Sequence, residues 1–154
     1  AAARRVAEAD VFMRGGQYKG WLPTLFLGKL MKGATVGVVG AGRIGAAYAR
    51  MMVEGLKMNL VYYDIYQNKG LEEYVAAYSE FLQSRGEPPV TCTRLDSVEA
   101  VLKVAEVVSL HPVLDKTTHH LMNEERLNLM KPDAILVNAS RGVDCPGQHI
   151  GRFV

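Results

Sequence analysis

The stretch from residue 35 to residue 50, TVGVVGAGRIGAAYAR, decides the fold. An apolar run rich in β-branched residues ends directly in Gly40, and apolar residues recur at helical spacing beyond it, which predicts a strand, a tight turn and a helix. Gly40, Gly42 and Gly45 have the G-x-G-x-x-G spacing. Glycine there permits a sharp turn, close approach of a pyrophosphate to the backbone, and contact between helix and strand. The helix N-terminus adds free amides that attract phosphate.

The rest of the chain alternates strand-like and helix-like segments. We expect strands at 34–39, 59–63, 90–93, 107–110 and 134–137, and helices at 1–17, 44–52, 71–83, 123–130 and after a capping box formed by Asp96 and Glu99. The expected apolar face of the second helix consists of Ile44, Tyr48, Met51 and Met52. This alternation predicts an α/β fold with a parallel sheet covered on both faces, which binds ligands at the carboxyl ends of its strands.

The composition excludes several classes of protein. At 154 residues, with 49% hydrophobic residues, 22% charged residues and a net charge of +2, the chain has the size and balance of one globular domain, so we expect no nucleic-acid partner. No apolar run approaches the roughly 18 residues of a membrane span, and residues 1–10 lack a secretory signal, which predicts an intracellular protein. Cys92 and Cys145 show no metal-binding spacing, so we expect reduced thiols and no metal.

Asp64 is the predicted ribose ligand. It lies nineteen residues after Gly45, at the end of the next expected strand, where a carboxylate can accept both hydroxyls of an adenosine ribose. A phosphate at that ribose would meet a repulsion of roughly 4 kcal/mol at about 4 Å, or nearly three decades in affinity, so NAD is favoured over NADP. The alternative is a glycine-rich turn followed by a solvated aspartate. Lys69 could weaken the discrimination, or be a solvated surface lysine.

Three segments carry a specific resemblance. TVGVVGAGRIGAAYAR, VVSLHPVLDKTTHHLMNEERL (107–127) and MKPDAILVNASRG (130–142) resemble the signature regions of the D-isomer-specific 2-hydroxyacid dehydrogenases. The sequence of residues 51–67 and the long insert after them are similar to those of the plant hydroxypyruvate reductases (glycerate dehydrogenases) of that family. The resemblance extends from Ala1 to Gly142, with a local departure at His111 to Leu114, where the family often has His-x-Pro-Leu.

The resemblance implies a Rossmann-type, doubly wound parallel sheet that is incomplete at its C-terminal end. Its expected parts are an N-terminal helix and connector (1–30), the NAD(P)-binding domain (31–142) and a tail that departs from the family pattern (143–154). It also implies a set of coenzyme-contacting residues. Beside the three glycines and Asp64, these are Arg43, Ile44, His111, Pro112, Thr118, Ala139, Ser140 and Arg141.

Arg141 is the expected catalytic anchor of the substrate. In the family the matching arginine binds the carboxylate and carbonyl of the substrate, and here Arg141 also follows an expected strand at its carboxyl end. A planar guanidinium suits a carboxylate, although a surface arginine at a strand exit is the alternative. We expect His119 and His120 to cap a helix or face solvent, and His111 to pack in its loop. His149 lies eight residues after Arg141, too near to match the family's catalytic histidine.

The implied function is hydride transfer between NADH and a small 2-keto or 2-hydroxy acid of the hydroxypyruvate or glyoxylate type. The pattern departs after Gly142, where the acid and base, glutamate and histidine, are not found, so we expect this chain to hold NAD without turnover. The alternative is a non-catalytic dinucleotide-binding or interaction module. The first helix resembles the family's dimer contact, which predicts a homodimer. Plant relatives act in peroxisomes, but this chain ends in Arg152, Phe153 and Val154, so we expect it in the cytoplasm.

Overall fold

The computed structural model describes residues 1–140, which fall into two compact units, Ala1–Met31 and the part from Lys32 onward. The first unit contains a 3-10 helix, η1 (Ala2–Arg4), and the helix α1 (Val6–Arg14). Arg5 between them is left-handed, with φ of 51°, so the α-helix begins later than the expected residue 1. It ends before Gly15 and Gly16, as the glycine pair predicts.

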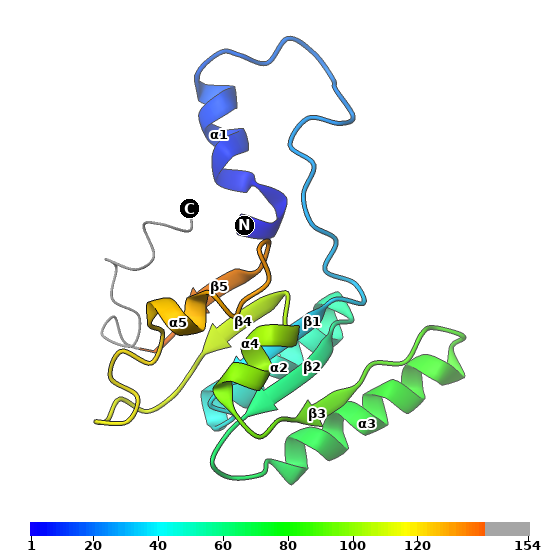
Figure 1. The fold of residues 1–154 in the computed structure, drawn as a ribbon. Helices are drawn as coiled ribbons and strands as arrows, with labels where there is room; N and C mark the ends of the chain where they lie inside the picture. Colours follow the sequence, from blue (N-terminus) through cyan, green and yellow to red (C-terminus); the bar gives the residue numbers. More distant parts are fainter. Residues whose placement is uncertain (141–154) are drawn as a thin grey trace. The chain divides into compact units, whose positions relative to one another are not determined.

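The second unit is a doubly wound α/β domain, which confirms the expected fold class. Its elements are β1 (Thr35–Val39), α2 (Arg43–Leu56), β2 (Asn59–Tyr63), α3 (Lys69–Ser84), β3 (Cys92–Arg94), α4 (Val98–Val104), β4 (Val107–Leu110), α5 (Glu124–Leu127) and β5 (Ile135–Asn138). All five strands are parallel, in the order β3-β2-β1-β4-β5 (Figure 1). The strand order reverses between β1 and β4, the point at which such sheets bind ligands.

Helices cover both faces of this sheet, with α4 in front of β1 and β2 and α2 behind them in Figure 1. The core on the α4 side joins apolar residues of β1, α4, β4 and α5, among them Val39, Val101 and Leu110. Gly37 allows this close packing, because a Cβ atom there would come within 2.5 Å of Cγ1 of Val101. The helix therefore lies directly on β1 and holds the strand whose end carries the glycine turn.

Three expectations about the helices were wrong in detail. The buried face of α2 consists of Gly45, Ala49 and Val53, whereas Ile44 is 71% exposed, because the helix lies so close to the sheet that only small residues fit beneath it. The cap of α4 is Ser97, whose Oγ accepts the amide of Ala100 over 3.1 Å, and not the residue before it. The helix expected at 123–130 is reduced to the short α5.

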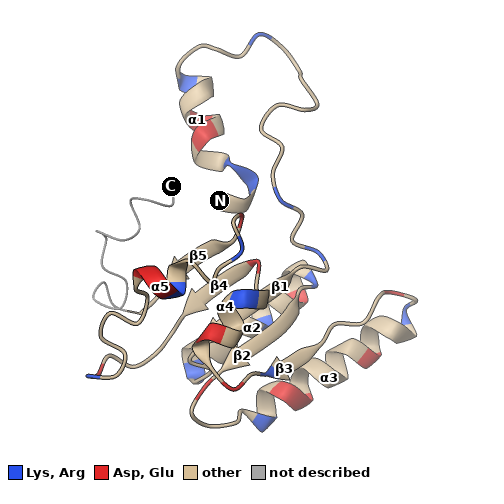
Figure 2. Ribbon diagram, viewed as in Figure 1, with Lys and Arg blue, Asp and Glu red and all other residues tan. Residues whose placement is uncertain are grey.

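Charges of both signs are spread along the chain rather than gathered by sign, as α3 and α5 show (Figure 2). The helices within residues 1–140 include none that is long and apolar enough to cross a membrane.

Candidate functional site

Four residues of the predicted site directly follow strands. Gly40 comes after β1, Asp64 after β2, His111 after β4 and Ala139 after β5. Because the strands are parallel, all four lie at the same edge of the sheet. The sheet's hydrogen bonding continues into this edge, where the amide of His111 donates to the carbonyl of Val39 over 2.8 Å. The strand register thus brings together residues that are far apart in the sequence.

The three glycines of the turn have different surroundings. Gly40 has φ of +89°, and a Cβ atom there would lie 2.7 Å from the carbonyl carbon of His111. A Cβ atom on Gly45 would overlap the carbonyl oxygen of Gly40. On Gly42 it would meet nothing within 4 Å. The fold itself requires glycine at the first and third positions, while the second faces open space beside the sheet edge.

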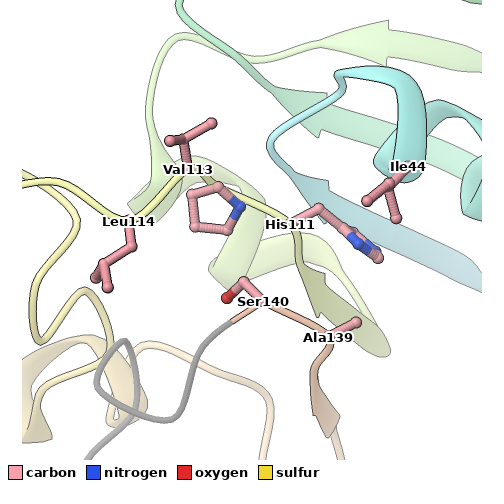
Figure 3. Close-up of a pocket in the computed structure, with 7 residues that line it drawn as sticks. Ile44, His111, Val113, Leu114, Ala139 and Ser140 are labelled. Carbon is pink, nitrogen blue, oxygen red and sulfur yellow. The ribbon is translucent and has the colours of Figure 1, made fainter.

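A cleft runs along this edge as two adjoining pockets of about 250 and 360 Å³. They share His111, Pro112 and Val113. The first pocket lies over the glycine turn and the end of β2 and includes Gly40, Gly42, Asp64, Asp115, Thr117 and Thr118. The second is lined by Ile44 at the start of α2, by the loop after β4, and by Ala139 and Ser140 after β5 (Figure 3). The cleft therefore contains most of the predicted coenzyme residues.

Asp64 is held at the wall of the first pocket by its own turn. Its Oδ1 accepts the amide of Tyr66 over 3.0 Å, while Oδ2 has no hydrogen-bond partner among residues 1–140. One carboxylate oxygen is thus available to a ligand hydroxyl in the pocket. Lys69, the other charged residue considered at this end, is an exposed residue at the start of α3.

His111 packs in its loop as the sequence predicted. Its ring lies 5.1 Å from that of Tyr48, and its Nε2 is 2.9 Å from Oγ of the fully buried Ser109. Burial lowers the pKa of His111, which keeps the ring neutral at neutral pH. Sequence reasoning missed both Tyr48 and Ser109 as its partners, since neither position carries a local signal for this contact.

The loop that carries Thr118 is closed by side-chain hydrogen bonds. Oγ1 of Thr118 donates to the carbonyl of Val113 over 2.7 Å and accepts the amide of Asp115 over 2.9 Å. The Asp115 carboxylate accepts the side-chain and backbone donors of Thr117, which lowers its pKa. Asp115 and Thr117 were not predicted as site residues, although an aspartate before two threonines is a signal for such a turn.

Asn68 connects the glycine turn to α3, a contact that the sequence analysis also missed. Its Nδ2 donates to the carbonyl of Ala41 over 2.7 Å, and its Oδ1 accepts the amide of Leu71 as the cap of the helix. Its own amide donates to the hydroxyl of the buried Tyr62 over 3.0 Å. An asparagine before a helical stripe is a signal for a cap, but its bond to a distant turn is not readable locally.

Several predicted residues lie elsewhere. Arg141, the expected substrate anchor, lies outside the described residues, as do His149, Cys145 and the tail. Arg43 is exposed and lines neither pocket. His119 and His120 are exposed, as expected, and their rings stack at 3.9 Å.

The described residues contain no group of three His, Cys, Asp or Glu that could hold a metal ion. Cys92 on β3 is a free thiol, and burial raises its pKa to about 12. Such a thiol is poorly nucleophilic at neutral pH.

Known proteins resemble this chain along nearly all of its length. A family model described as the D-isomer specific 2-hydroxyacid dehydrogenase, NAD binding domain, matches residues 1–146. Glycerate dehydrogenase HPR, peroxisomal, of Arabidopsis thaliana is 67% identical over 92% of this chain, and glycerate dehydrogenase of Cucumis sativus is 66% identical over 92%. Glyoxylate reductase of Thermococcus litoralis is 42% identical over 92%. The chain spans 37% of the length of each plant relative and 39% of the archaeal one.

Solved structures share the fold. The TT0316 protein from Thermus thermophilus has a TM-score of 0.80 and 37% identity, covering 99% of this chain and 42% of its own. The D-isomer specific 2-hydroxyacid dehydrogenase of Lactobacillus delbrueckii ssp. bulgaricus, in its NAD complexed form, has a TM-score of 0.77 and 26% identity, covering 98% of this chain and 40% of its own.

Proposed function

Since the chain belongs to the D-isomer specific 2-hydroxyacid dehydrogenase family, we propose that it binds NAD for hydride transfer to or from a small 2-keto or 2-hydroxy acid. NAD is the coenzyme of the matched domain, and bound NADH supplies the hydride. The two plant relatives are named glycerate dehydrogenases and the archaeal relative a glyoxylate reductase. Hydroxypyruvate and glyoxylate are therefore the proposed keto acids for the complete protein.

The cleft at the carboxyl edge of the sheet is the observation that carries this proposal. The open space at Gly42 leaves room for a pyrophosphate beside the backbone, next to the first amides of α2. Asp64 offers the unpartnered Oδ2 to a ribose hydroxyl in the same pocket. These features fit the two polar ends of an adenosine diphosphate group.

The second pocket is the proposed position of the nicotinamide end. Its lining is largely apolar, with Ile44, Pro112 and Leu114, which suits an aromatic ring and excludes water from it. Ala139 and Ser140 bring the chain leading to Arg141 to this pocket. We assign to Arg141 the binding of the substrate carboxylate, on the family resemblance of its segment and the suitability of a guanidinium for that group.

The 154 residues taken alone are proposed to bind the coenzyme without catalysing the reaction. Reduction of a ketone also needs a proton for the forming alkoxide, and general acid catalysis typically contributes about 10² to 10⁴-fold. None of the histidines described here suits this role: His111 is held by Ser109 and Tyr48, and His119 and His120 are exposed outside both pockets.

The test is calorimetric titration of the purified chain with NADH, followed by an assay of NADH oxidation with hydroxypyruvate or glyoxylate. We expect NADH binding that is lost in a Gly42→Leu variant, and no oxidation above the rate without protein. Failure to bind NADH would contradict the coenzyme assignment. Turnover of about one per second or more, lost on Arg141→Ala, would contradict the claim that the chain alone is inactive.

We further propose that the complete protein resides in peroxisomes, as the name of the Arabidopsis relative states for that protein.

We also propose that the protein is a homodimer joined through the first unit. In the first unit α1 presents Val6, Val11 and Met13 to solvent. Exposed apolar residues on one helix are typical of a protein contact.

A further inference from the structure

Arg94, the last residue of β3, reaches over to the turn that carries Asp64. Its register partner is Tyr62 on the neighbouring strand β2, two residues before Asp64. Arg94 therefore lies one strand away from the strand that leads into the coenzyme cleft. Its Nη2 donates to the carbonyl oxygen of Asp64 over 3.0 Å and lies 3.5 Å from that of Ile65. Asp64 and Ile65 both line the first pocket. The guanidinium is therefore fixed to the backbone of the pocket wall.

The charge of Arg94 is not neutralised by a direct ion pair within residues 1–140. Its charge acts on the carboxylate of Glu72, whose pKa is lowered chiefly by hydrogen bonds from Tyr62 and Gln67 and in part by the charges of Arg94 and Lys69. Glu72 makes its hydrogen bonds with those two neutral partners, and Arg94 makes its own with carbonyls. A positive charge thus stands beside the backbone of Asp64 and Ile65 at the pocket wall.

We propose that Arg94 is a second determinant of coenzyme choice, which supplies the cation for a phosphate on the adenosine ribose and so opposes the selectivity for NAD that Asp64 imposes. The inference rests on the proposed function, because it places the adenosine ribose at Asp64. Asp64 alone would repel a 2′-phosphate strongly, whereas an adjacent guanidinium offers that phosphate a positive charge. The chain should consequently accept NADPH more readily than a site with an unopposed carboxylate.

The experiment is calorimetric titration of the 154-residue chain with NADH and NADPH, at low salt and at about 1 M salt. Arg94→Gln removes the charge but keeps an amide that can donate to the carbonyls, and Arg94→Lys keeps the charge. Arg85→Gln, at the far end of α3, is the control for a change in net charge. The same substitutions at Arg94 in an Asp64→Asn background extend the measurement to a site that binds NADPH more tightly.

We expect Arg94→Gln to raise the Kd for NADPH about tenfold and that for NADH less than about twofold, with the difference shrinking at high salt. Arg94→Lys should retain most of the NADPH affinity, Arg85→Gln should change neither Kd, and the gain from Asp64→Asn should be lost when Arg94→Gln is added. An unchanged ratio of the Kd for NADPH to the Kd for NADH in Arg94→Gln, whether or not both nucleotides bind more weakly, would overturn the inference. Arg94 would then only support the turn that carries Asp64. Absence of NADH binding by the unsubstituted chain would overturn the proposed function, and this inference with it. If circular dichroism shows that Arg94→Gln is unfolded, the comparison of Arg94→Lys with the unsubstituted chain decides. Loss of NADPH affinity in Arg94→Lys with unchanged NADH affinity would contradict a role for the charge.

Discussion

A Cβ atom on residue 45 would overlap the carbonyl oxygen of Gly40, so the first turn of α2 packs directly on the residue that follows β1. The amides at the start of the helix are thereby held against the edge of the sheet. Gly42 lies between these two residues and has no such contact. The same motif thus contains glycines required by packing and one whose surroundings leave room for a ligand.

Alanine substitutions should separate these two kinds of glycine. Gly45→Ala forces helix and turn apart and should lower the free energy of unfolding by about 1–3 kcal/mol. Gly42→Ala should change it by less than about 0.5 kcal/mol, because its Cβ has open space and its φ of −69° suits any residue. Gly42→Ala should nevertheless weaken NADH binding at least about tenfold, because its Cβ would occupy the space proposed for the pyrophosphate. Urea unfolding and calorimetry provide the two measurements.

The reverse pattern, in which Gly42→Ala destabilises the chain and Gly45→Ala does not, would contradict this division of roles. Gly55→Ala is a suitable control, since Gly55 also has open space around its Cβ position but lies near the end of α2, away from both pockets.

The order of strands and helices was predictable because it depends on local periodicity, and the strand ends at Gly40 and Asp64 were predictable because apolar runs stop there. The buried face of α2 was not predictable in this way. Gly45 and Ala49 contribute little to a hydrophobic pattern, so the larger Ile44 and Met51 indicated the wrong face. The face of α2 that is buried is therefore set by close packing on the sheet.

Contacts between distant segments were also beyond the sequence analysis. Arg94 reaches Asp64 only because β3 lies next to β2, and local sequence does not specify neighbouring strands. The cap of α4 shifted by one residue because Asp96 and Ser97 are both good caps, and the direction of the incoming chain selects between them.

Asn68 should affect both stability and coenzyme binding, through different atoms. Asn68→Ala removes the cap of α3 and the donor to Ala41, and we expect it to cost about 1 kcal/mol and to weaken NADH binding. Asn68→Asp keeps an oxygen for the cap but cannot donate to the carbonyl of Ala41. It should therefore retain most of the stability in urea unfolding and lose NADH affinity in calorimetry as the alanine variant does. Full affinity in Asn68→Asp would show that the link to the glycine turn has no role in binding.

The first unit should drive self-association. All nine residues of α1 lie in the described part of the chain, and none of them is buried. We expect sedimentation velocity to show a concentration-dependent dimer, and Val11→Glu with Met13→Glu to shift it towards monomer without a change in NADH affinity. Val104→Glu, which alters an exposed residue of α4, is the control. A monomer at every concentration, or a dimer insensitive to the α1 substitutions, would contradict the proposed contact.

His111 should make stability depend on pH in the mildly acidic range. Burial lowers its pKa below the ordinary value of 6.5, so the unfolded chain binds this proton more readily than the folded one. The stabilisation is fully present above about pH 6.5 and is lost as the pH falls through the lower pKa of the folded chain. We expect the free energy of unfolding in urea to fall as the pH drops below about 6.5, and to fall less in His111→Gln.

The comparison between variants isolates His111 from the carboxylates, whose contributions are lost at lower pH because their pKa values are lowered, as for Glu72, Glu99 and Asp115. His119→Gln, at an exposed position, is the matched control and should retain the full pH dependence. Because His111 contacts Ser109 and the loop that joins the two pockets, its protonation should also weaken NADH binding below about pH 6.5. Identical pH profiles for the unsubstituted chain and His111→Gln would show that the imidazole is not the group being titrated.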